Sequence, residues 1–164
     1  MNLSLLALPL LLGLVSPSPE YPAMGADIYS PHADGDALVA GALRQARAEH
    51  KLVLVDLGAN WCIWCRRLHH TFETDPAVAA ELQRHYVVVL IDVNRRHGSQ
   101  RNAGLIARFH NPVRFGLPVL VVLDASGRQL TTEDSGNLES GAGHSPQKIV
   151  AFLRRWETAA ATGS

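Results

Sequence analysis

The sequence predicts an α/β protein, a three-layer α/β/α sandwich with helices on both faces of a mixed central β-sheet. Three continuous apolar runs have the length and β-branched content of buried strands, and stretches with apolar residues at helical spacing separate them. A Gly-containing turn after the third run adds a fourth, antiparallel strand. The length of 164 residues suits one globular domain better than two.

The charge balance and the cysteine count exclude several classes of protein. Fifteen Lys and Arg residues offset fifteen Asp and Glu residues, so no global field attracts nucleic acid or an anionic membrane, and we expect neither as a partner. The chain has two cysteines, Cys62 and Cys65, which allow at most one intramolecular bridge. A small scaffold stapled by several disulfides is therefore excluded.

The N-terminal segment differs in composition from the rest of the chain. Residues 3–15 are an almost unbroken apolar run, which as a helix would span only about 20 Å of the roughly 30 Å hydrocarbon core of a membrane. We therefore interpret residues 1–25 as a signal-peptide-like leader, although no Lys or Arg precedes the run, and expect a periplasmic or secreted protein with no stable membrane insertion after leader removal. The prolines of this region predict extended chain, and we assign residues 26–35 to a Pro-rich linker.

The folded domain is expected over residues 36–158, followed by a flexible tail over 159–164. Asp36 is a plausible N-cap for an amphipathic helix over 37–49. The first buried strand covers 52–57 and contains one acid, Asp56. A helix then begins at the cysteines, and Asp75-Pro76 starts another.

The second half of the domain continues the alternation. A strand is predicted over 86–93, a helix over 101–109, and a third strand over 117–123. The turn Asp124-Ala125-Ser126-Gly127 leads into a short strand over 128–132. Residues 133–145 are predicted as a polar Gly/Ser-rich loop that either contacts a partner or is slack, and Pro146 opens the last helix.

The two cysteines are the strongest candidates for chemistry. Cys62 and Cys65 follow a predicted strand directly and stand at the start of a predicted helix, where positions i and i+3 share one face. The unpaired N–H groups of a helix N-terminus favour a thiolate, and cysteines in such motifs have pKa values of roughly 3.5–7.5. We therefore expect Cys62 to be the attacking nucleophile and Cys65 the resolving thiol, with no cofactor and no resident metal.

Asp56 is the second candidate, because an acid inside an apolar strand is costly unless it is paired or protonated. It could simply be bonded to a neighbour at the strand end. We favour a raised pKa, which would let Asp56 accept a proton from Cys65 when a mixed disulfide is resolved.

These motifs together resemble the thioredoxin superfamily and, within it, the periplasmic thiol:disulfide interchange proteins similar to the C-terminal domain of DsbD. The resemblance covers about residues 36–157 and rests on segments 55–65, 71–78 and 116–119. It implies a thioredoxin-like fold and a thiol:disulfide oxidoreductase that exchanges its dithiol with protein substrates and is served by a thiol reductant. We expect it to act as a monomer.

The resemblance also assigns roles to residues around the cysteine pair. It places the buried acid of the family on Asp56 and implies that Pro118 follows a cis peptide bond opposite the disulfide. We expect Trp64, Leu117 and Pro118 to contact substrate, with Trp64 at the rim of the groove. Trp61 is expected to shield Cys62 and to line the same substrate-binding region.

Two alternatives stay open. Cys62, Cys65, His69 and His70 form a local cluster that could handle zinc or copper, although one straight helix closes a tetrahedral site poorly. The chain would then be a metal-handling protein. The other alternative is a non-catalytic binding module, in which a thioredoxin fold presents the groove around Trp64 and Pro118 to a client or metal without turnover. A basic stretch over 95–114, which contains no acid, could dock an acidic partner or be a solvated face.

Overall fold

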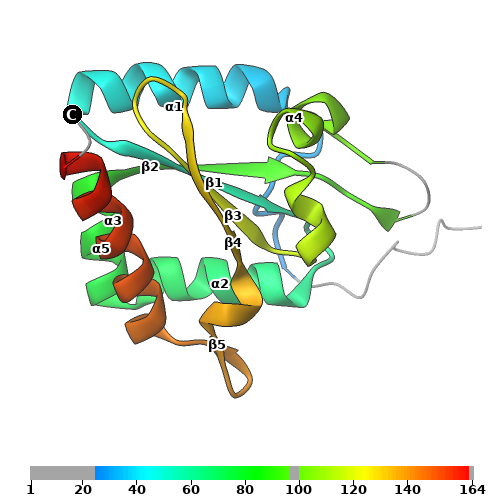
Figure 1. Ribbon diagram of the computed structural model, residues 1–164. Coiled ribbons are helices and arrows are strands. Elements are labelled where there is room, and N and C mark those ends of the chain that lie inside the picture. The colour runs from blue at the N-terminus through cyan, green and yellow to red at the C-terminus, as the bar shows by residue number, and fades with distance from the viewer. Residues whose placement is uncertain (1–24, 97–99, 163–164) are drawn as a thin grey trace, which may run out of the picture.

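A four-stranded mixed sheet forms the centre of the protein, with the strand order β2-β1-β3-β4 (Figure 1). The strands are β1 (Leu52–Gly58), β2 (Tyr86–Asp92), β3 (Val119–Leu123) and β4 (Gln129–Asp134). β1 pairs in parallel with β2 and antiparallel with β3, and β4 lies antiparallel to β3 at the edge. The predicted antiparallel hairpin after the third strand is therefore confirmed.

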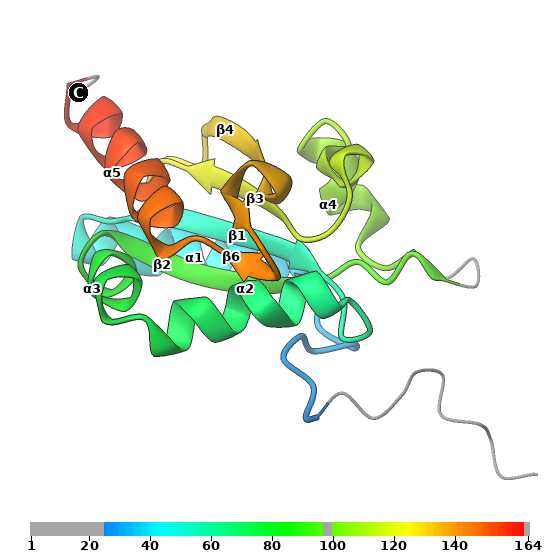
Figure 2. The same cartoon turned by 90° about the horizontal axis from the view of Figure 1, so that it is seen from below.

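The helices cover both faces of this sheet. The computed structural model describes residues 25–96 and 100–162. The α-helices are α1 (Gly35–Glu49), α2 (Ile63–Thr74), α3 (Pro76–His85), α4 (Ala103–Arg108) and α5 (Pro146–Thr162). Two 3-10 turns are η2 (Pro112–Phe115) and η3 (Ser135–Leu138). α1 and α4 lie on one face, and α2, α3 and α5 lie on the other (Figures 1 and 2). The predicted three-layer α/β/α sandwich is confirmed.

Alternate side chains of β1 enter two separate cores, as the pleat of a strand requires. Val53, Val55 and Leu57 pack against α1 and α4, whereas Leu52 and Leu54 pack against the helices on the opposite face. Every residue of β1 is buried, because it is a central strand covered on both sides. The same alternation directs Asp56, two residues after Leu54, toward the face that α2 covers.

The two helices after β1 begin as the sequence predicts. Cys62 is the N-cap of α2, and its sulfur accepts a hydrogen bond from the backbone N–H of Cys65. Asp75 ends α2 and caps α3, where its carboxylate accepts from the N–H groups of Ala77 and Val78. Leu68 and Phe72 form the buried face of α2.

The start of α1 differs from the prediction. Asp34 is the N-cap, and its carboxylate accepts from the N–H groups of Asp36 and Ala37, so the assignment of Asp36 as the cap is wrong. The helix includes Gly35 because the Gly35 N–H finds a partner outside the helix, the side-chain oxygen of Asn102 at 2.8 Å. That contact spans 67 positions in sequence, which is beyond the reach of local capping rules.

Both ends of the predicted domain also differ. The leader over 1–25 falls almost wholly outside the described residues. The expected linker over 26–35 instead contacts the domain, because Tyr29 is fully buried. At the other end α5 continues to Thr162, so residues 159–162 are helical and not a flexible tail. No helix within 25–96 and 100–162 has the length and apolar character needed to cross a membrane.

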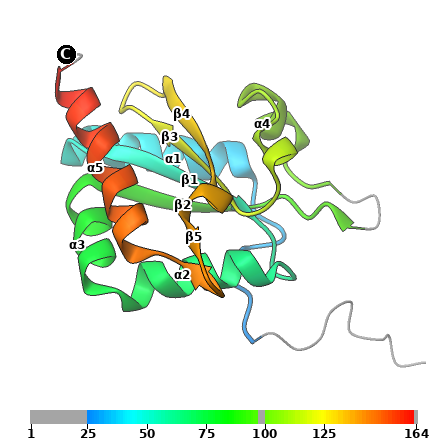
Figure 3. The ribbon, with the colours of Figure 1, turned by 60° about the horizontal axis from the view of Figure 1, so that its bottom comes forward.

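Residues 133–145 are not a slack loop. β4 continues to Asp134, η3 follows, and β5 (Glu139–Ser140) and β6 (Gly143–His144) form a small antiparallel hairpin beside α2 (Figure 3). Leu138 anchors this segment in the core shared with α2 and α5. One buried leucine among polar and glycine residues gives no periodic signal, which explains the wrong prediction.

Leu54→Ala should lower the free energy of unfolding by about 2–5 kcal/mol, because it leaves a cavity in the middle of a core strand. Urea denaturation measures this loss. The matched control is Leu38→Ala on α1, where the side chain is 37% exposed and the expected change is within about 0.5 kcal/mol. Equal losses in the two variants would contradict this account of the core.

Candidate active site

Cys62 and Cys65 form a disulfide at the N-terminus of α2, with their α-carbons 5.2 Å apart. Cys62 retains 6% exposure and Cys65 retains none, so only Cys62 can meet the sulfur of another protein. The Cys65 N–H lies 3.1 Å from the Cys62 sulfur and would stabilise a thiolate there when the bond is reduced. This geometry favours attack by Cys62 and resolution by Cys65, and that order stays a prediction.

A cis peptide bond between Leu117 and Pro118 faces the disulfide, as the family resemblance implied. The carbonyl oxygen of Leu117 lies 3.5 Å from the Cys62 sulfur. Ser135, at the start of η3, donates a buried hydrogen bond of 2.5 Å to the carbonyl of Pro118. The segment over 133–145, predicted as a polar loop, thus supports the backbone opposite the cysteines.

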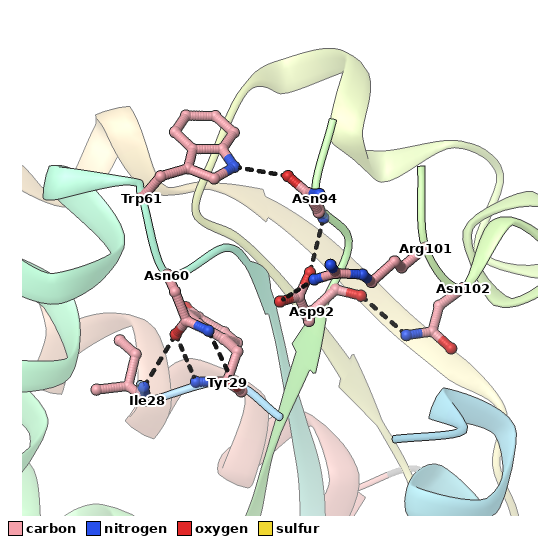
Figure 4. Close-up of polar contacts among 8 residues, drawn as sticks. All are labelled: Ile28, Tyr29, Asn60, Trp61, Asp92, Asn94, Arg101 and Asn102. Atoms are coloured by element: carbon pink, nitrogen blue, oxygen red, sulfur yellow. Dashed lines mark hydrogen bonds and ion pairs between the residues drawn. The ribbon is translucent and has the colours of Figure 1, made fainter. Parts of the chain in front are cut away.

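A groove of about 470 Å³ lies beside the disulfide. Its walls include both tryptophans and Leu117 (Trp61, Cys62, Ile63, Trp64, Arg95, Arg96, Gly116 and Leu117). Trp61 donates from Nε1 to the side chain of Asn94 at 2.9 Å (Figure 4). The guanidinium of Arg96 lies 4.1 Å from the Trp61 ring centre, and that of Arg67 lies 4.6 Å from the Trp64 ring centre. Both tryptophans therefore line the groove beside Cys62, and their contact with substrate stays a prediction.

Asp56 is completely buried on β1. Its Oδ1 accepts a 3.0 Å hydrogen bond from the hydroxyl of Tyr29, and its Oδ2 has no partner among the described residues. Burial raises the pKa of Asp56 from 3.8 to about 7, and the Tyr29 hydrogen bond opposes this rise. Burial thus moves the pKa of Asp56 upward, in the direction that the sequence predicts, while the role of Asp56 as a proton acceptor stays a prediction.

Tyr29 is a residue of the site that the sequence analysis missed. Asn60, directly before Trp61, fixes it: its side-chain oxygen accepts from the N–H groups of Ile28 and Tyr29 at 2.9 Å each, and its amide donates to the Tyr29 carbonyl (Figure 4). Arg66 adds a hydrogen bond to the carbonyl of Ala26. An aromatic residue in a Pro-rich segment was the only signal of this contact in the sequence.

A polar cluster at the end of β2 holds the groove wall (Figure 4). Asp92 pairs with Arg101 at 3.0 Å and accepts from the backbone N–H of Asn94, which in turn holds Trp61. Two arginines of the basic stretch form ion pairs: Arg101 with Asp92, and Arg108 with Asp36 of α1. Arg95 and Arg96 are the members of the stretch that line the groove.

The residues of the zinc alternative do not converge. Cys62 and Cys65 are bonded to each other, while His69 lies 3.2 Å from Glu73 on the same helix. Among the residues that the structure describes, one group has the spacing of a metal site, and it lies between α3 and α5 (Glu81, His85 and Glu157). Glu81 of that group already accepts hydrogen bonds of 2.9 and 2.6 Å from the guanidinium of Arg154.

Residues 36–125, more than half of the chain, match the Thioredoxin-like family. The chain belongs to this family. Together with the Cys62–Cys65 pair, membership supports thiol:disulfide oxidoreductase activity.

Similar proteins agree with this assignment. The thiol:disulfide interchange protein DsbD of Actinobacillus pleuropneumoniae is 32% identical over 84 residues, which are 51% of this chain and 13% of that protein. DsbD 1 of Pseudomonas aeruginosa is 35% identical over 86 residues, 52% of this chain and 14% of that protein. The similarity thus covers a small part of these longer relatives.

Solved structures include domains of similar length. The disulphide isomerase of Xylella fastidiosa has 32% identity and a TM-score of 0.69, over 79% of this chain and 95% of that chain. The C-terminal domain of Neisseria meningitidis DsbD in the oxidised form has 21% identity and a TM-score of 0.53, over 75% of this chain and 96% of that chain. The latter similarity shows the shared thioredoxin fold.

Asp56 should make the oxidised protein less stable as the pH rises. Its pKa is about 7 in the folded protein and near 3.8 when unfolded, so between these values the folded state holds a proton that the unfolded state has lost. The free energy of unfolding should therefore fall from about pH 4 to pH 7 and then level off. Asp56→Asn removes this slope and should be more stable than the wild type at about pH 8 by a few kcal/mol.

Urea denaturation at a series of pH values measures both proteins. Asp34→Asn, at the exposed cap of α1, is the control and should keep the wild-type slope. The raised pKa would be contradicted if the difference in the free energy of unfolding between Asp56→Asn and the wild type did not change with pH.

Proposed function

We propose that the protein exchanges its Cys62–Cys65 dithiol with disulfides of other proteins in the cell envelope, and that a separate thiol reductant restores the dithiol. The observation that carries this proposal is the arrangement of one slightly exposed and one buried sulfur beneath a groove, with an acid of raised pKa behind them. The apolar run over 3–15 and the interchange proteins among the relatives support the location.

The first step joins the protein to its substrate. The Cys62 thiolate attacks one sulfur of the substrate disulfide, a new S–S bond forms, and the other substrate sulfur leaves as a thiolate that takes a proton from water. The Cys65 N–H and the helix N-terminus favour the charged form of Cys62 before attack. Trp64, Leu117 and Pro118 are proposed to hold the substrate backbone at the groove.

The second step releases the substrate. Cys65 gives up its proton toward Asp56 and attacks the Cys62 sulfur, which breaks the mixed disulfide and expels the second substrate thiolate. The substrate has then gained two electrons, and the cysteine pair has lost them. Because Cys65 is buried, this attack is confined to the sulfur beside it, which suits resolution and not direct attack on clients.

The groove favours one class of substrate. Arg95 and Arg96 line it beside Cys62, together with the apolar Ile63 at 46% exposure. Phe115, at 44% exposure, directly precedes Gly116 of the groove wall. We propose that the preferred substrates are protein segments in which an acidic residue and an apolar residue flank the disulfide. Such a segment complements both the charge and the apolar rim of the groove.

Cys62→Ser should abolish disulfide reduction, because the attacking sulfur is gone. Cys65→Ser should instead accumulate mixed disulfides on Cys62, because the resolving sulfur is gone. Insulin reduction with a thiol donor measures the first effect, and non-reducing electrophoresis with mass spectrometry measures the second. Turnover that survives Cys62→Ser, or recovery of bound metal without mixed disulfides, would favour the binding-module or metal-handling alternative.

The double variant Arg95→Gln/Arg96→Gln should slow the reduction of a disulfide peptide with acidic flanks by about threefold to tenfold, as loss of two exposed charge pairs implies. A peptide with neutral flanks should react at the wild-type rate. Arg44→Gln/Arg84→Gln, which removes two exposed arginines away from the groove, is the matched control. An equal loss on both peptides would contradict the charge preference.

A further inference from the structure

The hydroxyl of Tyr29 lies beside the buried acid and near the buried cysteine. It donates to Asp56 at 3.0 Å. A methyl group placed on Gly58 would lie 2.2 Å from this hydroxyl and 3.0 Å from the Cys65 sulfur. Both atoms therefore occupy the room that the missing side chain of Gly58 leaves open, the hydroxyl from the N-terminal segment and the sulfur from α2.

The segment that carries Tyr29 is fixed and not loosely apposed. Asn60 makes three hydrogen bonds of 2.9 Å to the backbone of Ile28 and Tyr29. The guanidinium of Arg66 donates hydrogen bonds to the carbonyls of both Ala26 and Asn60, and so holds the segment against the first turn of α2. The hydroxyl is thus held at one point relative to the cysteine pair.

The other groups near this point are apolar or engaged elsewhere. The residues paired with Asp56 on the flanking strands are Leu90 and Leu120. The nearby charges are Arg66, which holds backbone carbonyls, and Asp92, which is paired with Arg101. Among the described residues, Tyr29 therefore has a hydroxyl that donates to Asp56 and also lies close to the Cys65 sulfur.

We propose that Tyr29 relays the proton between Cys65 and Asp56. This inference rests on the exchange reaction proposed above. As Cys65 attacks the Cys62 sulfur, its thiol proton passes to the Tyr29 oxygen while the Tyr29 proton passes to Asp56 Oδ1. The bond between Cys62 and the substrate breaks, the substrate leaves as a thiolate and is protonated by water, and Tyr29 ends neutral.

The electrostatics of the site agree with a neutral relay. Burial and the neighbouring Asp56 carboxylate hold the pKa of Tyr29 well above 10, so the phenol keeps its proton and presents it to the acid. The hydrogen bond in turn stabilises the carboxylate and lowers the pKa of Asp56 against the effect of burial. Loss of the hydroxyl should therefore raise the pKa of Asp56 further.

Tyr29→Phe tests the relay, because it removes the hydroxyl and keeps the ring. We expect the pKa of Asp56, measured by carbon-13 NMR of its carboxyl group in the oxidised protein, to rise by about one unit. In the reduced protein, the release of substrate thiol from a Cys62 mixed disulfide should slow about tenfold at pH 7, and its pH profile should move upward by the same amount.

Tyr86→Phe is the matched control. Tyr86 is also buried and donates from its hydroxyl to the carbonyl of Leu153, outside the site. The Tyr86→Phe variant should lose about as much free energy of unfolding as Tyr29→Phe, while it keeps the wild-type Asp56 pKa and the wild-type pH profile of thiol release. If Tyr29→Phe does not fold, Tyr29→Met, which also removes the hydroxyl and keeps an apolar side chain over Asp56, should move the Asp56 pKa in the same upward direction.

The relay would be overturned if Tyr29→Phe lost stability but kept the wild-type Asp56 pKa and the wild-type pH profile of thiol release. It would also be overturned if Tyr86→Phe shifted the Asp56 pKa and this profile by the same amounts as Tyr29→Phe. The NMR measurement uses the oxidised protein and needs no turnover. Failure of the wild type to reduce any disulfide would therefore refute the proposed exchange reaction without deciding the effect of Tyr29 on Asp56.

Discussion

The burial of the Asp56 carboxyl group in the central strand, behind a disulfide, is the constraint on which the rest of the site depends. A buried carboxylate loses its hydration, and the lost hydration makes the charged form unfavourable in free energy. The acid therefore takes up a proton near neutral pH. Because one carboxylate oxygen lacks a partner among the described residues, the Tyr29 hydroxyl is its main source of stabilisation. The pleat of β1 directs the acid toward α2 and thereby toward Cys65.

Several separate parts of the chain meet around this acid. β1 supplies Asp56 and the open space at Gly58, α2 supplies the two sulfurs, and residues before the first helix supply Tyr29. On the outer side, the cis bond at Pro118 faces Cys62 and is held by Ser135. The site therefore requires the complete fold, although its reactive sulfurs lie three positions apart.

Local patterns predicted the parts of the protein that local physics decides. The CxxC pair at a helix start, the capping Asp75 and the isolated acid in an apolar strand are each visible within a few residues, and the structure confirms their geometry. The cis bond at Pro118 followed from the family resemblance and not from any local pattern.

Contacts between distant segments could not be predicted in this way. Tyr29 reaches Asp56 across 27 positions and Asn60 across 31, and no periodicity marks such a contact. Ser135 and the small hairpin after it lie in a polar stretch whose burial depends on α2 and on the backbone at Pro118. The same reason explains why Asp34 and not Asp36 caps α1, since Asn102 from another part of the chain holds Gly35.

The ionisation of Asp56 in the wild-type protein is the property on which the proposed proton transfer depends most directly. A carbon-13 NMR titration of the Asp56 carboxyl group in the oxidised protein, where neither cysteine titrates, measures it alone. The structure predicts a pKa of about 7. A pKa near the ordinary value of about 4 would show that water or another donor reaches the carboxylate, and would contradict its role as the proton acceptor of the site.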